Sequence, residues 1–187
     1  AGSFASSLSP AGRLPPITVF ADADWGGDKD SRRSTTGWLI RVGRCWVDWK
    51  CQKQATVALS SCEAEYVAVS SAAQATMNIH QLLTEVHFLS WICGGAATPP
   101  IPLLLNDNKS AIAMAHSDSL HDRSKHIDIK WHFIREQIEG KFVALQWIST
   151  HEQVADILTK ALKPQLFIKF RDQLVTPRPT GQLLRQA

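Results

Sequence analysis

Two short apolar runs in this chain each lead into an aspartate, and they limit the folds that the rest of the sequence can adopt. Residues 17–21 read ITVFA and precede Asp22, while residues 102–106 read PLLLN and precede Asp107. Short runs as apolar as these predict buried strands. Because open α/β sheets bind their ligands at the carboxyl ends of their strands, we expect both aspartates to lie in a functional site.

Periodicity, capping motifs and turn residues predict the other elements. Ser60 with Glu63, and Thr150 with Gln153, have the spacing of capping boxes, in which Glu63 is expected to reach back to the amide of Ser60. The expected elements are a strand at 17–21, a hairpin at 38–42 and 45–49, extended chain at 55–59, a long helix after Ser60, a loop at 91–100, a strand at 102–107, a short helix through Ala115, a helix around 127–138, a strand at 142–148, a helix after Thr150, and an amphipathic turn or two around 166–174. This order predicts an α/β fold with a mixed sheet and helices packed on its faces.

Length and composition indicate one domain. The 187 residues suffice for a single well-cored unit. We expect a linker or cloning remnant at 1–15, the domain at 16–175 and a flexible tail at 176–187. No apolar run approaches the roughly 20 residues of a membrane span, and the four cysteines lack CxxC spacing, so neither a membrane segment nor a zinc knuckle is expected.

Two pairs of acidic residues need a choice between neighbours. Asp24 competes with Asp22, but Asp22 ends the strand and is held more rigidly, as a metal ligand must be. Glu63 and Glu65 lie about 200° apart on a helix, so they cannot face one site together. Since Glu63 has a capping role and Glu65 shares a face with Val69, Glu65 is the better candidate.

Asp107 and Asp156 each have a structural alternative. Asp107 can cap the helix that follows it. Asp156 has Lys160 four residues later, which is the spacing of a surface ion pair worth about 0.2–0.5 kcal/mol. Each acid is weak support alone, whereas four acids at strand ends and helix starts, grouped against the desolvation cost of like charges, make most sense around a cation.

Several motifs in sequence order resemble one family. They are ADADWGG (21–27), DSRRSTTG (30–37), VALSSCEAEY (57–66), NDNKSA (106–111), KHIDI (125–129) with HFIRE (132–136), and VADILTK (154–160). From about Val19 to Phe170 the chain resembles the ribonuclease H domain of copia-type long-terminal-repeat retrotransposon Pol polyproteins. The resemblance implies the ribonuclease H-like fold, a five-stranded mixed sheet flanked by helices on both faces.

The resemblance also implies an activity and its residues. The expected enzyme is a ribonuclease H, an endonuclease that hydrolyses the RNA strand of RNA/DNA hybrids during reverse transcription and leaves 5′-phosphate and 3′-hydroxyl ends. Two Mg²⁺ ions, which Mn²⁺ can replace, are the implied cofactors. The implied metal ligands are Asp22, Glu65, Asp107 and Asp156, and the residue assisting product release is His151.

The same resemblance gives expectations for the substrate and partners. A protein that recognises the shape and the 2′-hydroxyls of a hybrid needs polar groups near the acids. Positively charged side chains are needed to bind the phosphates of the hybrid. The candidates are Ser60, Ser61 and Asn108 for the first role and Arg32, Arg33 and Lys53 for the second. The expected partners are the hybrid and the reverse transcriptase domain of the same polyprotein, with no membrane and no small-molecule cofactor. The expected location is cytoplasmic, in virus-like particles.

Two other functions are alternatives to ribonuclease H activity. An integrase-type strand transferase would use two aspartates and a later glutamate, for which Glu139, 32 residues after Asp107, is available. Such an enzyme has no use for Glu65 or Asp156. The other alternative is a catalytically idle module that binds hybrids, and the presence of all four acids gives it no support.

Overall fold

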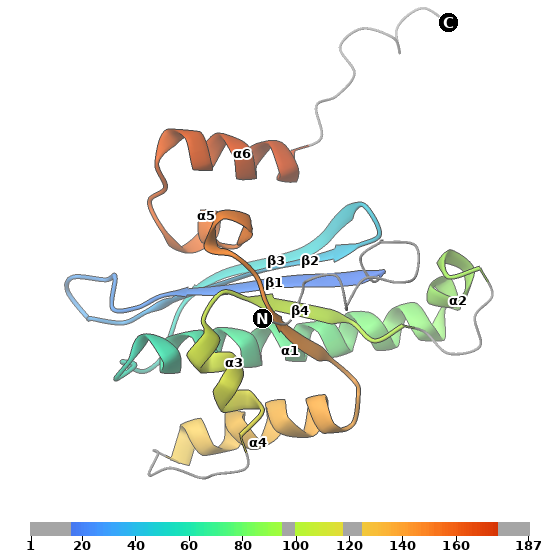
Figure 1. Ribbon diagram of the computed structural model, residues 1–187, viewed down its shortest axis with the longest axis horizontal. Coiled ribbons are helices and arrows are strands. Elements are labelled where there is room, and N and C mark those ends of the chain that lie inside the picture. The colour runs from blue at the N-terminus through green and yellow to red at the C-terminus, as the bar shows by residue number, and fades with distance from the viewer. Residues whose placement is uncertain (1–15, 95–99, 118–124, 176–187) are drawn as a thin grey trace, which may run out of the picture.

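The computed structural model describes residues 16–94, 100–117 and 125–175 (Figure 1). The expected linker at 1–15 and the expected tail at 176–187 lie outside the described residues, as do residues 95–99 of the loop expected at 91–100. None of the helices in the described ranges has the length and apolar content needed to cross a membrane.

The described residues form strands and helices in the order that the sequence predicts. The strands are β1 (Ile17–Asp24), β2 (Thr35–Val42), β3 (Cys45–Lys53), β4 (Leu103–Asn106) and β5 (Ala144–Trp147). The helices are α1 (Ser61–Glu85), α2 (Phe88–Ile92), α3 (Lys109–Ala115), α4 (Lys125–Glu139), the 3₁₀ turn η2 (Thr150–Glu152), α5 (Asp156–Thr159) and α6 (Pro164–Leu174).

The five strands form one mixed sheet in the order β3-β2-β1-β4-β5. The first three strands are antiparallel neighbours, whereas β1 pairs with β4 in parallel and β4 pairs with β5 in parallel. The predicted five-stranded mixed sheet is therefore confirmed. Strand β1, which contains Asp22, and strand β4, which Asp107 follows directly, lie side by side inside this sheet.

Helices cover both faces of the sheet (Figure 1). Alternate strand residues belong to two different cores, one on each face. On the face of α1, Val19 and Leu104 pack with Tyr66 of α1. On the face of α5 and α6, Phe20 and Leu105 belong to a second core together with Phe170 of α6. Because β1 and β4 are buried on both sides, they read as continuous apolar runs in the sequence.

Three expected elements differ from the structure. The chain at 55–59 forms bends between β3 and α1 and pairs with no strand. The loop expected from residue 91 begins later, because residues 91 and 92 belong to α2, which packs Leu89 into the larger core. The helix expected after Thr150 is interrupted: η2 covers three residues, and α5 begins only at Asp156.

One of the two predicted capping boxes is present. The Ser60 hydroxyl accepts from the amide of Glu63 at 3.1 Å, and the Glu63 carboxylate accepts from the amide of Leu59 at 2.9 Å, one residue earlier than expected. The box of Thr150 and Gln153 is wrong. The cap of η2 is Ser149, which leaves the Gln153 side chain free to enter the core between the strands.

The side chain of Gln153 connects the two central strands by hydrogen bonds. Its buried side-chain amide donates to the carbonyl of Ala21 at 2.9 Å and, over a longer 3.5 Å, to the carbonyl of Leu105. Gln153→Ala removes these bonds inside the core, so we expect the free energy of unfolding to fall by about 1–3 kcal/mol. Urea denaturation measures it.

The exposed Gln165 of α6 provides the matched control. Gln165→Ala is expected to change the free energy of unfolding by less than about 0.5 kcal/mol. An equal fall in the free energy of unfolding of the two variants would show that the buried hydrogen bonds of Gln153 do not stabilise the fold.

Candidate active site

The pairing of β1 with β4 places Asp22 beside Asp107. The last matched pair of the parallel ladder is Phe20 with Leu105. Each aspartate follows its member of that pair by two residues, and side chains two residues apart on a strand point to the same face. The carboxylates therefore meet just beyond the end of the ladder.

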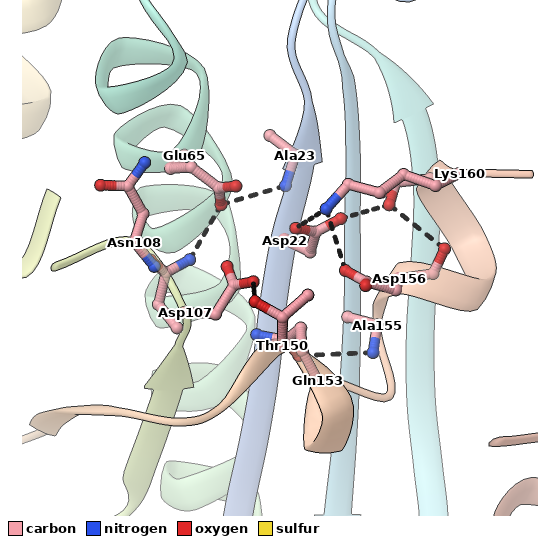
Figure 2. Close-up of polar contacts among 12 residues, drawn as sticks. Asp22, Ala23, Glu65, Asp107, Asn108, Thr150, Gln153, Ala155, Asp156 and Lys160 are labelled. Atoms are coloured by element: carbon pink, nitrogen blue, oxygen red, sulfur yellow. Dashed lines mark hydrogen bonds and ion pairs between the residues drawn. The ribbon is translucent and has the colours of Figure 1, made fainter. Parts of the chain in front are cut away.

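Glu65 joins them from the first long helix (Figure 2). Its carboxylate accepts hydrogen bonds from the amide of Ala23 at 3.1 Å and from the side-chain amide of Asn106 at 2.9 Å. One carboxylate oxygen from each of Asp22, Glu65 and Asp107 lies within 4.8 Å of the other two. We call these three residues the acidic triad.

Burial makes the triad electrostatically costly. Asp22 is fully buried and Glu65 is 5% exposed. Burial, followed by the negative charge of Asp22, raises the pKa of Glu65 to about 9 from its ordinary 4.5. Carboxylates held this close in a protein interior repel one another, so a cation between them would relieve a large unfavourable energy.

Asp156 lies on the other side of Asp22 and is paired with a lysine. The ammonium of Lys160 is 2.9 Å from Asp22 Oδ1 and 3.0 Å from Asp156 Oδ1 (Figure 2). Burial, followed by the charge of Asp22, raises the pKa of Asp156 to about 7. Burial also disfavours the charged ammonium of Lys160, but attraction to the two aspartates outweighs it and raises the pKa of the lysine.

The ion pair of Asp156 and Lys160, which was the structural alternative for Asp156, is present, but its carboxylate is buried and not on the surface. Asp156 is 2% exposed, and its lysine partner also contacts Asp22 from a strand distant in the sequence. Sequence spacing predicted the pair but not its burial or its third member.

A glycine lets α5 approach the aspartate this closely. Gly37 of β2 is paired with Asp22 across the sheet. A Cβ atom at Gly37 would lie 2.5 Å from Cγ2 of Thr159 and 3.0 Å from Cβ of Leu158, so any larger residue would push α5 away. The hydroxyl of Thr159 uses this proximity to donate to Asp22 Oδ2.

Neutral donors that the sequence did not single out hold the triad in position. The side-chain amide of Asn106 donates to the Ala21 carbonyl at 2.9 Å as well as to Glu65, and Thr150 donates its hydroxyl to Asp107 at 2.6 Å. The backbone carbonyl of Asp107 accepts from the indole of Trp147 at 3.0 Å. The only local signal for Asn106 was an amide directly after three leucines.

The residues expected to read the substrate have structural contacts of their own. Ser60 caps α1, and Ser61, the first residue of that helix, is exposed. Asn108 caps α3 by accepting from the amide of Ala111 at 3.0 Å. His151 lies in η2 with an exposed side chain, and its carbonyl accepts from the ammonium of Lys169 at 2.6 Å.

The cations expected to bind phosphates lie near the start and end of the antiparallel hairpin. Arg32 and Arg33 are exposed in the loop that leads from β1 to β2, and Arg32 has a positive φ of 55°. Lys53, at the end of β3, forms an ion pair with Asp28 of the same loop. Its charge is thus partly committed within the protein, whereas the two arginines are presented to solvent.

The acids that compete with the triad lie elsewhere. Asp24 packs against the turn at Gly27, where an added Cβ would meet its carboxylate. Glu63 caps its helix, and Glu139 pairs with Arg135 at 2.6 Å at the end of α4. Within the described part of the chain, none of these three places a ligand atom together with those of the triad. Glu65, and not Glu139, is thus the glutamate that meets the two aspartates.

The donors of the triad fit a divalent cation. Three carboxylate oxygens with hard-ligand character match the preference of Mg²⁺ and Mn²⁺. The triad is assembled from two strand ends and one helix, each fixed by hydrogen bonds, which is the rigidity that a metal site requires. Chemically, such a site can stabilise the charge that develops during displacement at phosphorus.

Comparisons with known proteins agree with the fold and extend it. No protein-family model matches the chain. The chain is 36% identical over 167 residues to the retrovirus-related Pol polyprotein from transposon RE1 of Arabidopsis thaliana, covering 89% of this chain and 11% of that protein. It is 32% identical over 168 residues to the Pol polyprotein from transposon TNT 1-94 of Nicotiana tabacum, covering 89% and 12%. The chain thus spans about a tenth of the length of these relatives.

Solved structures resemble this fold at low sequence identity. The N-terminal ribonuclease H domain of rv2228c from Mycobacterium tuberculosis matches with a TM-score of 0.52 and 13% identity, over 76% of this chain and 95% of that one. LC11-RNase H1 in complex with an RNA/DNA hybrid matches with a TM-score of 0.50 and 13% identity, over 76% and 93%. At this identity the likeness concerns the fold alone. The chain therefore has the ribonuclease H fold and is similar to a segment of retrovirus-related Pol polyproteins from plant transposons, in agreement with the sequence motifs.

Proposed function

We propose that this domain is a ribonuclease H that hydrolyses the RNA strand of RNA/DNA hybrids during reverse transcription. The observation that carries the proposal is the acidic triad at the carboxyl ends of two parallel strands, with oxygens within 4.8 Å of one another. The ribonuclease H fold and the homology to transposon Pol polyproteins support the same reaction. The expected products carry 5′-phosphate and 3′-hydroxyl ends.

The four acids would divide between two Mg²⁺ ions, which Mn²⁺ can replace. Asp22, central among them, would contribute to both ions, Glu65 and Asp107 to one, and Asp156 to the other. Ions bound there would activate a water and stabilise the departing oxygen. Around them the chain supplies orientation: Asn106 fixes Glu65, and Thr150 fixes Asp107.

The hybrid is the substrate that this site supports best. LC11-RNase H1, which shares the fold, was solved with an RNA/DNA hybrid. Hybrids are recognised through 2′-hydroxyls and groove shape, which suits the polar groups of Ser60, Ser61 and Asn108 at two helix starts. The exposed Arg32 and Arg33 would attract phosphates, with Lys53 contributing less because of its pairing with Asp28.

Two further expectations belong to this proposal. His151, exposed in η2, would assist the release of product. The natural partner would be the reverse transcriptase domain of the same polyprotein, because the curated relatives are Pol polyproteins of which this chain matches about a tenth. The reaction would then take place in cytoplasmic virus-like particles.

The direct test is cleavage of a labelled hybrid by the wild-type chain and by Asp22→Asn. We expect Mg²⁺-dependent cleavage of the RNA strand, absent with single-stranded RNA and with duplex DNA. Asp22→Asn should lower the rate at least about 1,000-fold, because metal ions supply most of the charge stabilisation. Circular dichroism checks that the variant is folded.

Asp24→Asn is the matched control, since Asp24 ends the same strand but packs against the turn at Gly27. It should retain cleavage within about threefold of the wild type. Asp22→Asn with undiminished cleavage would remove that residue from the site. Strand transfer on DNA ends without hybrid cleavage would replace the proposal with the integrase-type alternative.

The raised pKa of Glu65 generates a prediction about stability. Because its pKa is about 9 in the folded protein against an ordinary 4.5, folding favours the protonated carboxyl. That contribution is complete below the ordinary pKa and is lost as the pH rises through about 9. In EDTA, the melting temperature should therefore fall as the pH rises across this window, and Glu65→Gln should flatten the fall.

Metal should reverse this effect only in proteins that retain Glu65. At pH 8, millimolar Mg²⁺ or Mn²⁺ is expected to raise the melting temperature of the wild type and of the control Glu63→Gln, but not that of Glu65→Gln. Differential scanning fluorimetry measures all three. Equal metal responses of the two glutamine variants would contradict the choice of Glu65 over Glu63.

A further inference from the structure

The negative charges on the two sides of Asp22 are stabilised by different kinds of partner. Glu65 and Asp107 accept hydrogen bonds from neutral donors, namely the amide of Ala23, the side chain of Asn106 and the hydroxyl of Thr150. On the opposite side, the space between Asp22 and Asp156 holds the ammonium of Lys160 (Figure 2). The hydrogen-bond donors to Glu65 and Asp107 are thus neutral, whereas Asp22 and Asp156 share a positively charged partner.

We propose that Lys160 is the resident cation between Asp22 and Asp156, so that the protein binds one divalent ion tightly at the acidic triad and a second only when Lys160 leaves. This inference rests on the proposed function, because it concerns how the same site takes up its two metals. It makes Lys160 a positioning residue that controls metal occupancy.

Distances show that the lysine and a second ion compete for the same space. The ammonium nitrogen lies 2.9 Å from Asp22 Oδ1 and 3.0 Å from Asp156 Oδ1. A Mg²⁺ ion bound by these carboxylates would need about 2.0–2.1 Å to their oxygens, and would thus stand within the space of the ammonium. Two cations at such separation also repel each other strongly in a buried site.

The fold holds the backbone of Lys160 at this position. Lys160 follows α5 directly, and its amide donates to the carbonyl of Asp156 at 3.0 Å. Gly37 allows α5 to reach the sheet, and Thr159 donates its hydroxyl to Asp22 beside the lysine. The contact with both aspartates is therefore a product of the tertiary structure.

The lysine side chain nevertheless has a path out. It is 34% exposed, whereas the side chains of Asp22 and Asp156 are 0% and 2% exposed. A long flexible stem can move its ammonium to solvent without a backbone change. Lys160 can thus leave when a second ion arrives, at the cost of two charge-assisted hydrogen bonds.

The test is the number and affinity of Mn²⁺ ions bound by the full chain without nucleic acid, followed by electron paramagnetic resonance and calorimetry. The wild type should bind one ion tightly and a second at least tenfold more weakly. Lys160→Met should strengthen the second site at least tenfold. The control Lys163→Met, which removes a nearby exposed lysine, should bind as the wild type does.

Asp156→Asn keeps the proposal testable if Lys160→Met fails to fold. It removes a carboxylate on the lysine side and should leave the tight ion at the triad within about twofold of its original affinity. Loss of a tight ion in Asp156→Asn would overturn the proposal, because Asp156 would then bind metal despite the lysine. An unchanged second site in folded Lys160→Met would overturn it too.

Hybrid cleavage, measured separately, distinguishes this inference from the proposed function. Two equally tight ions in the wild type together with hybrid cleavage would overturn the role of Lys160 and leave the nuclease intact. One tight ion without hybrid cleavage would support the role of Lys160 and remove the nuclease. The absence of any bound ion would overturn both.

Discussion

Repulsion among the buried carboxylates of Asp22, Glu65 and Asp156 determines how the rest of the site is built. Asp22 is fully buried between acids on both sides, and the pKa of Glu65 reaches about 9. A protein that keeps such a cluster gives up stability in the metal-free state. The hydrogen bonds of Asn106 and Thr150 and the ammonium of Lys160 are the means by which this fold tolerates it.

Local patterns were sufficient to predict the triad and the central strands. Asp22 and Asp107 end apolar runs whose burial on both faces is visible in their composition, and the strand pairing then aligns them. The choice of Glu65 over Glu63 followed from helical geometry together with the capping role expected of Glu63. Motifs shared with a known family added the sheet of five strands and the helices on both faces, which the structure confirms.

Contacts between distant segments could not be predicted in this way. The spacing of Thr150 and Gln153 indicated a capping box, yet burial of Gln153 against the carbonyl of Ala21 takes that side chain away from the backbone of its own turn. Asp156 and Lys160 had the spacing of an exposed helical pair, and only the approach of α5 to Gly37 turns them into part of the site. In both cases the deciding partner lies more than 100 residues earlier in the chain.

Asp22 of β1, Asp107 directly after β4 and Glu65 of α1 are proposed here as one metal site. Anomalous X-ray diffraction from crystals soaked in Mn²⁺ tests it most directly, because manganese is located independently of any assumption about its ligands. We expect an anomalous peak from a manganese ion bound by oxygens of Asp22, Glu65 and Asp107. Crystals that show no peak at these residues, from protein that still cleaves hybrid with Mn²⁺, would contradict it.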